Sequence, residues 1–184
     1  KYSQNIAIVT KSSKISYNEL LETGDRIGEQ IKTRCLVFLL SSNNIEAIAG
    51  YLGFMRVKAV PVLINDTIDK KYLLNLLEKY QPDFIYGPSS IFQLNSKFSA
   101  IYSYNDYLLL KTDFNLGYSL HPDLAQLLTT SGSTGSPKFV RQSYKNIFNN
   151  AKSISQYLGI TSVDRPITTM PMSYSYGLSI INSH

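Results

Sequence analysis

The sequence predicts an α/β fold, built from parallel-sheet layers that crossover helices connect. Short apolar or β-branched runs alternate with segments of helical periodicity through the first half of the chain, as in parallel strands joined by helices. Residues 35–40 are continuously apolar, which is typical of a strand covered on both faces. Ser16 and Glu19 have the spacing of a capping box, which begins a helix.

The first expected elements follow that order. Residues 6–9 form a strand, and the helix that starts at the capping box runs to about Lys32. After the strand at 35–40, the polar residues 41–44 cap a second helix, whose apolar face carries Ile45, Ile48, Ala49, Leu52 and Met55.

The next strand spans residues 60–64, and its Pro61 indicates an edge strand or a strand start, because proline donates no backbone hydrogen bond. A third helix carries apolar residues at 73, 76, 77 and 80 and ends at Gln81-Pro82.

The second half gives fewer signals. Residues 83–86 predict a short strand, whereas residues 87–118 are rich in Ser, Asn and Tyr and give only scattered apolar pairs. Residues 124–129 form a strand that leads into a loop of small residues. From Ser143 an amphipathic helix has Ile147, Ala151, Ile154 and Leu158 on its apolar side. No internal repeat or domain linker is visible.

Composition narrows the class of protein. The net charge of +5 is spread over the chain, and its densest basic run is Lys70-Lys71, so we expect no nucleic-acid partner. No run approaches the roughly 20 apolar residues that a membrane span needs, and no signal peptide is recognisable.

Cysteine and histidine are scarce. The one cysteine, Cys35, lies in an apolar run and is expected to be buried, and with only two histidines the chain has too few soft ligands for a zinc site of the usual kind. These features favour a cytoplasmic protein. The chain lacks an initial methionine and stops after an apolar segment, from which we expect a fragment.

The loop after residue 129 carries the chemistry. Gly132 and Gly135 allow close backbone approach, neighbouring Ser and Thr residues supply hydroxyls, and Lys138 adds a positive charge, a composition that suits a polyphosphate. The alternative is an ordinary Ser/Gly surface turn. The order of residues excludes the Walker loop, since Pro137 precedes the lysine and Phe139 follows it. It also excludes the dinucleotide-binding and hydrolase-elbow patterns.

Residues 130–138 (Thr-Ser-Gly-Ser-Thr-Gly-Ser-Pro-Lys) resemble the signature loop of the AMP-dependent synthetases and ligases, the adenylate-forming enzymes that include acyl-CoA synthetases. Three other stretches are similar to family segments in the same order: residues 15–20, residues 55–62, and residues 170–178, which resemble a segment near the acyl pocket.

The resemblance implies that residues 1–184 are part of the large N-terminal AMP-binding domain, without the C-terminal lid. It implies ATP and Mg²⁺ as cofactors and a small carboxylate as substrate. The carboxylate forms an acyl-adenylate, and the acyl group passes to CoA or to the phosphopantetheine thiol of an acyl-carrier protein. Because adenosine-binding segments and the lid lie beyond residue 184 in the family, we expect no turnover from this chain alone.

The resemblance also assigns site residues. Lys138 is the catalytic electrostatic clamp, Thr134 is a hydroxyl beside phosphate or metal, and no protein metal ligand is assigned. The residues expected to bind ATP are Thr130, Ser131, Gly132, Ser133, Thr134, Gly135, Ser136 and Lys138. Tyr174, Tyr176 and Gly177 are expected to border the carboxylate substrate, the alternative being packing at a strand end.

Some positions depart from the family pattern. Phe139 stands where the family usually has glycine, Gln142 or Tyr144 replaces a histidine, and Tyr174 replaces another histidine. These departures bear on the acyl substrate more than on the nucleotide. Two alternative functions stay open: a non-catalytic or degenerate nucleotide-binding module of the same fold, and a kinase or NTPase.

Overall fold

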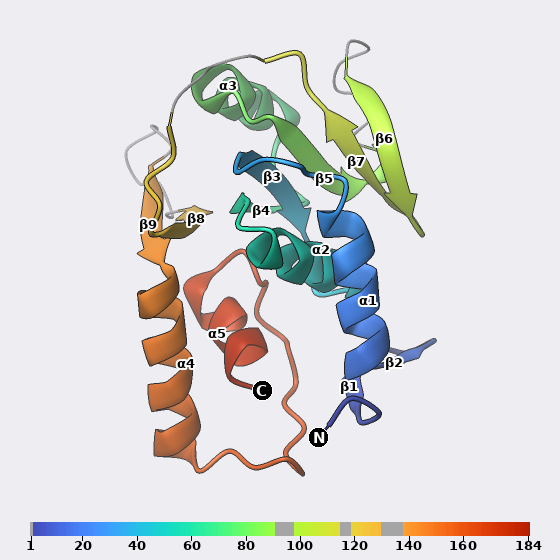
Figure 1. Cartoon of the computed structure of the whole chain (residues 1–184), viewed down its shortest axis with the longest axis vertical. Helices are drawn as coiled ribbons and strands as arrows, with labels where there is room; N and C mark the ends of the chain where they lie inside the picture. The colour runs from blue at the N-terminus through green and yellow to red at the C-terminus, as the bar shows by residue number, and fades with distance from the viewer. Residues whose placement is uncertain (1, 91–97, 115–118, 130–137) are drawn as a thin grey trace.

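A computed structural model describes residues 2–90, 98–114, 119–129 and 138–184. The described part contains a two-stranded sheet, a seven-stranded sheet and five helices (Figure 1). The elements are β1 (Ile6–Val9), β2 (Lys14–Ser16), α1 (Tyr17–Gly28), β3 (Leu36–Ser41), α2 (Ile45–Arg56), β4 (Val60–Asn65), α3 (Lys70–Tyr80), β5 (Phe84–Pro88), β6 (Ser99–Tyr104), β7 (Tyr107–Lys111), β8 (Leu124–Thr129), β9 (Phe139–Ser143), α4 (Tyr144–Leu158) and α5 (Ser175–Ser183).

The large sheet has a parallel centre and antiparallel flanks. Its order is β6-β7-β5-β3-β4-β8-β9, and β5, β3, β4 and β8 are parallel to their neighbours within that group. β7 and β6 on one side, and β9 on the other, run antiparallel. The predicted α/β fold with crossover helices is therefore confirmed, and the antiparallel flanks are additional.

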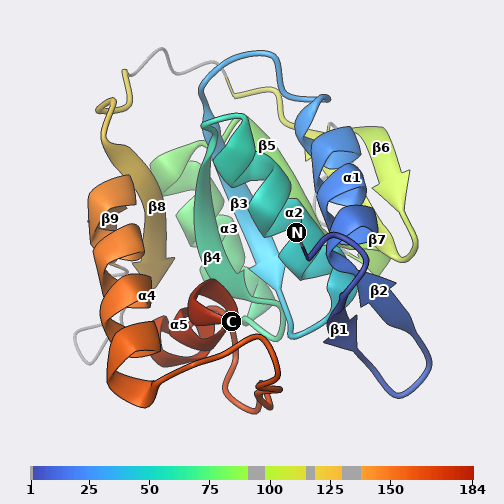
Figure 2. The ribbon, with the colours of Figure 1, turned by 60° about the horizontal axis from the view of Figure 1, so that its bottom comes forward.

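Helices cover both faces of the sheet (Figure 2). On one face α3 packs its leucines against Phe38, Leu40 and Val62. On the other face α1, α2 and α5 pack against Leu39, Leu63 and neighbouring side chains. This double covering explains why β3 is buried at every position.

The capping box at the start of α1 forms as predicted. The Ser16 hydroxyl accepts a hydrogen bond from the Glu19 backbone N–H at 3.2 Å, and the Glu19 carboxylate accepts one from the Ser16 N–H at 2.8 Å. These hydrogen bonds lower the pKa of Glu19. The helix ends at Gly28 rather than near Lys32, because the chain turns there and the Ile31 N–H donates to the Gly28 carbonyl.

Pro61 lies in a central strand, so the edge alternative was wrong and the strand-start alternative is confirmed. It is the second residue of β4, which has β3 on one side and β8 on the other. Among the described residues, β4 pairs with β8 at Val62 and Leu63, beyond the proline. The backbone N–H that Pro61 lacks therefore falls at a position of β4 that is not paired with β8.

Two parts of the sheet were not predicted. β6 and β7 form a hairpin within the segment that gave no regular pattern, and Asn105 has a positive φ of 49° in its turn. β9 pairs antiparallel with β8 and leads directly into α4, whose Ser143 cap forms a second capping box with Asn146.

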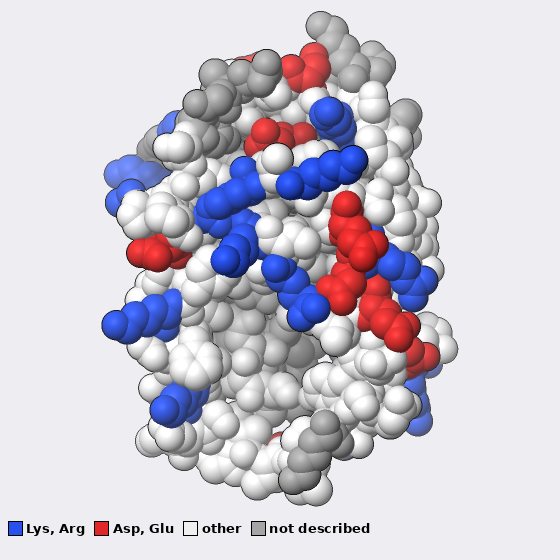
Figure 3. Space-filling model, in the orientation of Figure 1, with Lys and Arg blue, Asp and Glu red and all other residues white. Residues whose placement is uncertain are grey.

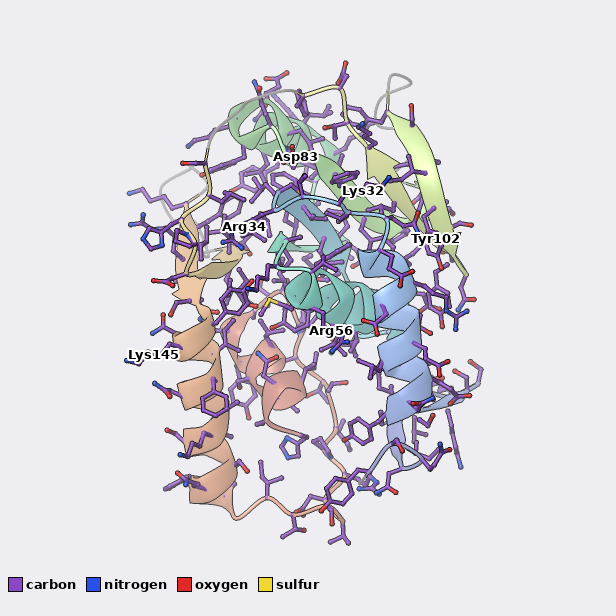
Figure 4. All side chains as sticks on the ribbon, in the orientation of Figure 1. Lys32, Arg34, Arg56, Asp83, Tyr102 and Lys145 are labelled. Atoms are coloured by element: carbon purple, nitrogen blue, oxygen red, sulfur yellow. The ribbon has the colours of Figure 1, made fainter. Side chains whose placement is uncertain are left out.

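Arg34 fastens the amino ends of three parallel strands. Its guanidinium donates to the carbonyls of Lys58 at 2.6 Å, His121 at 2.7 Å and Leu124, which precede or begin β4 and β8. Arg34 itself stands just before β3 (Figure 4). One planar cation thus ties segments that are up to 90 residues apart in the sequence.

Cys35 is 5% exposed, as expected, and burial raises the pKa of its thiol to about 12. We expect iodoacetamide at pH 8 to alkylate the native chain about 100-fold or more slowly than the urea-unfolded chain, because the thiolate is the reactive species. Equal alkylation rates of the native and the urea-unfolded chain would contradict the buried position of Cys35.

The raised pKa of Cys35 also predicts that the native chain loses stability as the pH rises from about 9 to about 12, because the thiol of the unfolded chain ionises first.

Within the described ranges, no helix combines the length and apolar character required to cross a membrane.

Candidate functional site

The carboxyl ends of the four parallel strands lie at one edge of the large sheet. β3, β4 and β5 end at Ser41, Asn65 and Pro88, and β8 ends at Thr129. In open α/β sheets ligands bind outside this edge. The small-residue loop predicted to hold phosphates therefore leaves the sheet from the edge where such a ligand is expected.

Most of that loop lies outside the described residues, namely Thr130, Ser131, Gly132, Ser133, Thr134, Gly135 and Ser136. The structure defines both of its ends. Thr129 pairs with Phe139 across β8 and β9, so the loop closes an antiparallel hairpin. Lys138 is exposed immediately before β9.

Phe139 anchors the exit of the loop to α3. Its ring lies 4.5 Å from the ring centroid of Tyr80 and 6.4 Å from that of Phe38. Aromatic pairs in this range add stability beyond the area they bury. The departure from the family's glycine therefore has a packing role, and it fixes the backbone next to Lys138.

The three residues expected at the substrate lie at a helix start, so the strand-end alternative was wrong. Tyr174 is the N-terminal cap of α5 and is 45% exposed, and Tyr176 in the first turn is 65% exposed. Gly177 is buried against the carbonyls of Met170 and Pro171, where a Cβ would clash. The absence of a side chain therefore lets α5 approach the segment before it.

Asn43 holds that same segment, a role that local sequence patterns did not indicate. Its side-chain amide donates to the carbonyls of Thr168 and Met170, both at 2.8 Å. Its carbonyl oxygen accepts from the Met172 backbone N–H at 2.9 Å. The helix cap predicted for residues 41–44 is made by Asn44, whose side chain accepts from the Ala47 N–H. Asn43 is thus left to connect the end of β3 with the entry to α5.

A pocket of about 500 Å³ opens between α4, α5 and the β8–β9 hairpin. This volume lies within the range of small-molecule sites. Tyr176 lines the pocket, whereas Tyr174 and Gly177 are not among its lining residues. The lining residues are Gln126, Leu128, Gln142, Asn146, Ile147, Asn150, Ile154, Ser175, Tyr176, Leu178, Ser179 and Asn182.

The two positions considered for the missing histidine differ in their surroundings. Gln142 lies on β9 and lines the pocket. Tyr144 is the first residue of α4, and its hydroxyl is buried without a hydrogen-bond partner among the described residues.

The buried Tyr51 holds the pocket residue Asn182 through a hydrogen bond. The Tyr51 hydroxyl on α2 donates to the side-chain oxygen of Asn182 at 3.1 Å. Burial raises the pKa of Tyr51 to about 12, so this hydroxyl stays protonated and keeps its donor at neutral pH. This hydrogen bond from α2 therefore fixes the orientation of the Asn182 side chain in the pocket.

Basic side chains gather in a band across the face drawn in Figure 3. In the same orientation, Figure 4 places Lys32, Arg34 and Arg56 there. Lys32 and Arg34 precede β3, at the amino edge of the sheet, and Arg56 is paired with Asp25. The band thus lies at the edge of the sheet opposite to Thr129, where β8 ends, and is not assigned to this site.

Comparisons with known proteins give a family match, curated relatives and a solved structure of the same fold. The family model described as "AMP-binding enzyme" matches residues 1–183. The chain is 24% identical over 187 residues to the 2-succinylbenzoate–CoA ligase of Bacillus velezensis, covering 97% of this chain and 38% of that protein. It is 28% identical over 193 residues to the enzyme of the same name from Bacillus cytotoxicus, covering 96% and 37%.

A solved structure shares the fold. The O-succinylbenzoate coenzyme A synthetase of Bacillus subtilis, in a complex with ATP and a magnesium ion, superposes with a TM-score of 0.71 at 24% identity. The match covers 98% of this chain and 51% of that one. The chain thus spans less than two fifths of the curated relatives and about half of the solved chain.

Proposed function

Because the chain belongs to the AMP-binding enzyme family, we propose that residues 1–184 form part of the large N-terminal domain of an ATP-dependent carboxylate-activating ligase. Such an enzyme joins a carboxylate to the α-phosphate of ATP, releasing pyrophosphate, and passes the acyl group to CoA or a carrier thiol. The observation that carries the proposal is the signature loop at residues 130–138, placed between the carboxyl end of β8 and the start of β9. The CoA ligase names of the curated relatives support it.

In this proposal the loop grips the β- and γ-phosphates of ATP. Gly132 and Gly135 bring backbone N–H groups close to the phosphates, and the hydroxyls of Ser131, Ser133 and Thr134 add hydrogen bonds. Lys138 contributes a positive charge from a position that the pairing of Thr129 with Phe139 holds in place. Mg²⁺, when bound with ATP, would neutralise charge on the phosphate oxygens.

The acyl part of the substrate would enter the pocket beneath α4 and α5. Tyr176 lines that pocket and is exposed, which supports its predicted place beside the substrate. Tyr174 and Gly177 would act indirectly, by positioning the helix that carries Tyr176. Tyr174 caps the helix that carries Tyr176, and Gly177 lets this helix pack closely on the preceding segment.

We further propose that the protein works in the cytoplasm, in keeping with its reduced, buried Cys35.

Acyl-adenylate formation is the test of the proposed reaction. A protein of the relatives' full length that contains this chain should form acyl-AMP and pyrophosphate from ATP and a carboxylate, detected by mass spectrometry. A kinase or NTPase would instead give ADP and a phosphorylated product or free phosphate. The 184-residue chain alone should release no pyrophosphate, and detectable release would contradict the need for the remaining segments.

Replacing Lys138 by alanine should weaken ATP–Mg²⁺ binding about 10- to 100-fold, corresponding to roughly 1.5 to 3 kcal/mol for a charge-assisted contact. Calorimetric titration of a protein of the relatives' full length that contains this chain measures this change. Lys145→Ala is the matched control, because it removes the same charge from an exposed site on α4. Binding by Lys138→Ala within twofold of the parent would contradict the clamp. If ATP–Mg²⁺ causes no NMR chemical-shift change at Gly132 and Gly135 of the parent chain, the result would favour a non-catalytic module of the same fold.

A further inference from the structure

Two glutamines form a paired floor in the pocket beneath α4 and α5. Gln126 on β8 lies directly opposite Gln142 on β9 in the strand register. The Gln126 Nε2 donates to Gln142 Oε1, so the two amides are joined side by side. Both residues line the pocket, and Gln126 is only 1% exposed.

The paired amides leave hydrogen-bonding capacity unused. Gln126 Oε1 is buried and has no hydrogen-bond partner among the described residues. A buried polar atom without a partner destabilises a fold, because it has lost its hydration without gaining a hydrogen bond. Gln126 also stands in a strand that is otherwise apolar up to Thr129, where a leucine would satisfy the packing. An unmatched amide that lines a pocket is expected where a ligand completes its hydrogen bonds.

The pocket lining contains no charged side chain among the residues described. Its polar members are amides and hydroxyls, and its apolar members are Leu128, Ile147, Ile154 and Leu178 together with the Tyr176 ring. The cation at the start of α4, Lys145, projects from the side of that helix away from α5 (Figure 4). A ligand carboxylate placed deep in this pocket would therefore lose hydration without gaining a positive partner.

We propose that the pocket selects carboxylic acids that carry an uncharged hydroxyl or amide group at the end remote from the reacting carboxylate, and that it disfavours dicarboxylates. The remote group completes the hydrogen bonds of the Gln126–Gln142 pair, while apolar side chains pack against the body of the acid. This inference rests on the proposed function, because it takes the pocket as the acyl site of the ligase.

Side-chain amide resonances provide a direct readout that requires neither ATP nor turnover. The ¹⁵N-labelled chain is titrated with 4-hydroxybenzoate, benzoate and benzene-1,4-dicarboxylate, and the Gln126 and Gln142 amide signals are followed. We expect 4-hydroxybenzoate to shift both signals and to bind about three- to tenfold more tightly than benzoate, the gain of one net hydrogen bond. The dicarboxylate should bind about tenfold or more weakly than benzoate.

Gln126→Met tests the assignment, since methionine fills a similar volume without an amide. In this variant the ratio of the benzoate and 4-hydroxybenzoate dissociation constants should fall to about one. The matched control Gln156→Met, at an exposed position on α4, should leave the ratio unchanged. A thermal melt verifies that both variants are folded, since Gln126→Met also removes the donor to Gln142 Oε1.

Three results would overturn the inference: equal binding of benzoate and 4-hydroxybenzoate, tighter binding of the dicarboxylate, or no shift of the glutamine amides at saturation. Failure here together with acyl-AMP formation by the full-length protein would refute only the pocket selectivity. Selective binding of these acids together with an absence of acyl-AMP would refute only the proposed reaction.

Discussion

Replacing Gly53 by alanine should destabilise the chain by about 3 kcal/mol or more, the largest effect we expect from a single methyl group. A Cβ at position 53 on α2 would overlap the carbonyl oxygen of Gly24 on α1. The obstacle is backbone, so no side chain can rotate away and the two helices must separate. This strain outweighs the roughly 1 kcal/mol that alanine gains over glycine in helix propensity.

Alanine substitutions at Gly53, Gly28 and Gly24 together test the close contact between α1 and α2. A Cβ at Gly28 would lie 2.8 Å from the Gly53 carbonyl oxygen, and one at Gly24 would lie 3.1 Å from the Ala49 carbonyl oxygen. Urea denaturation should therefore rank the alanine variants by loss of stability as Gly53, then Gly28, then Gly24. A Gly53→Ala variant as stable as the parent would show that propensity dominates and that the helices are less closely packed than described.

Replacing Asn43 by alanine should remove about 2 to 4 kcal/mol of local stability, because three backbone groups of residues 168–172 lose their partner at once. Hydrogen exchange at the Met172 amide should accelerate about 30-fold or more. Asn43→Asp separates the contributions. Its carboxylate can still accept from the Met172 N–H but has no amide hydrogens for the Thr168 and Met170 carbonyls.

The control for this variant is Asn149→Ala, at an exposed position on α4, which should leave exchange at Met172 unchanged. If Asn43→Ala exchanges Met172 at the parental rate, the segment before α5 is held by the packing of Met172 and Gly177 rather than by the amide. In the proposed enzyme the same variant should raise the KM for the carboxylate more than the KM for ATP, since α5 lines the acyl pocket.

Elements with local signals were predictable. The helix starts at Ser16 and Ser143 depend on side chains three residues apart, and β3 depends on a continuous apolar run. These interactions lie within one turn or one strand, so the sequence alone displays them. The flanking strand β9 was missed because it is partly exposed and carries Arg141 and Gln142, which gives no clean alternation.

The candidate site was only partly predictable, because its contacts join distant segments. Asn43 meets residues that follow it by 125 positions or more, and no local pattern encodes that meeting. Gln126 did leave a signal, namely an amide in the middle of an apolar strand, but its partner Gln142 belongs to the strand that was missed. The assigned roles of residues 130–136 remain predictions, since they lie outside the described part of the chain.

The place of β8 in the strand order has a consequence for synthesis on the ribosome. Residues 1–114 contain β3 to β7, yet one side of β4 is completed only when residues 124–129 arrive. Until then the apolar run Val60–Asn65 presents an unpaired strand edge, which other nascent chains can join. Pausing of translation between these two segments should therefore promote aggregation, and an early chaperone should be most useful at that stage.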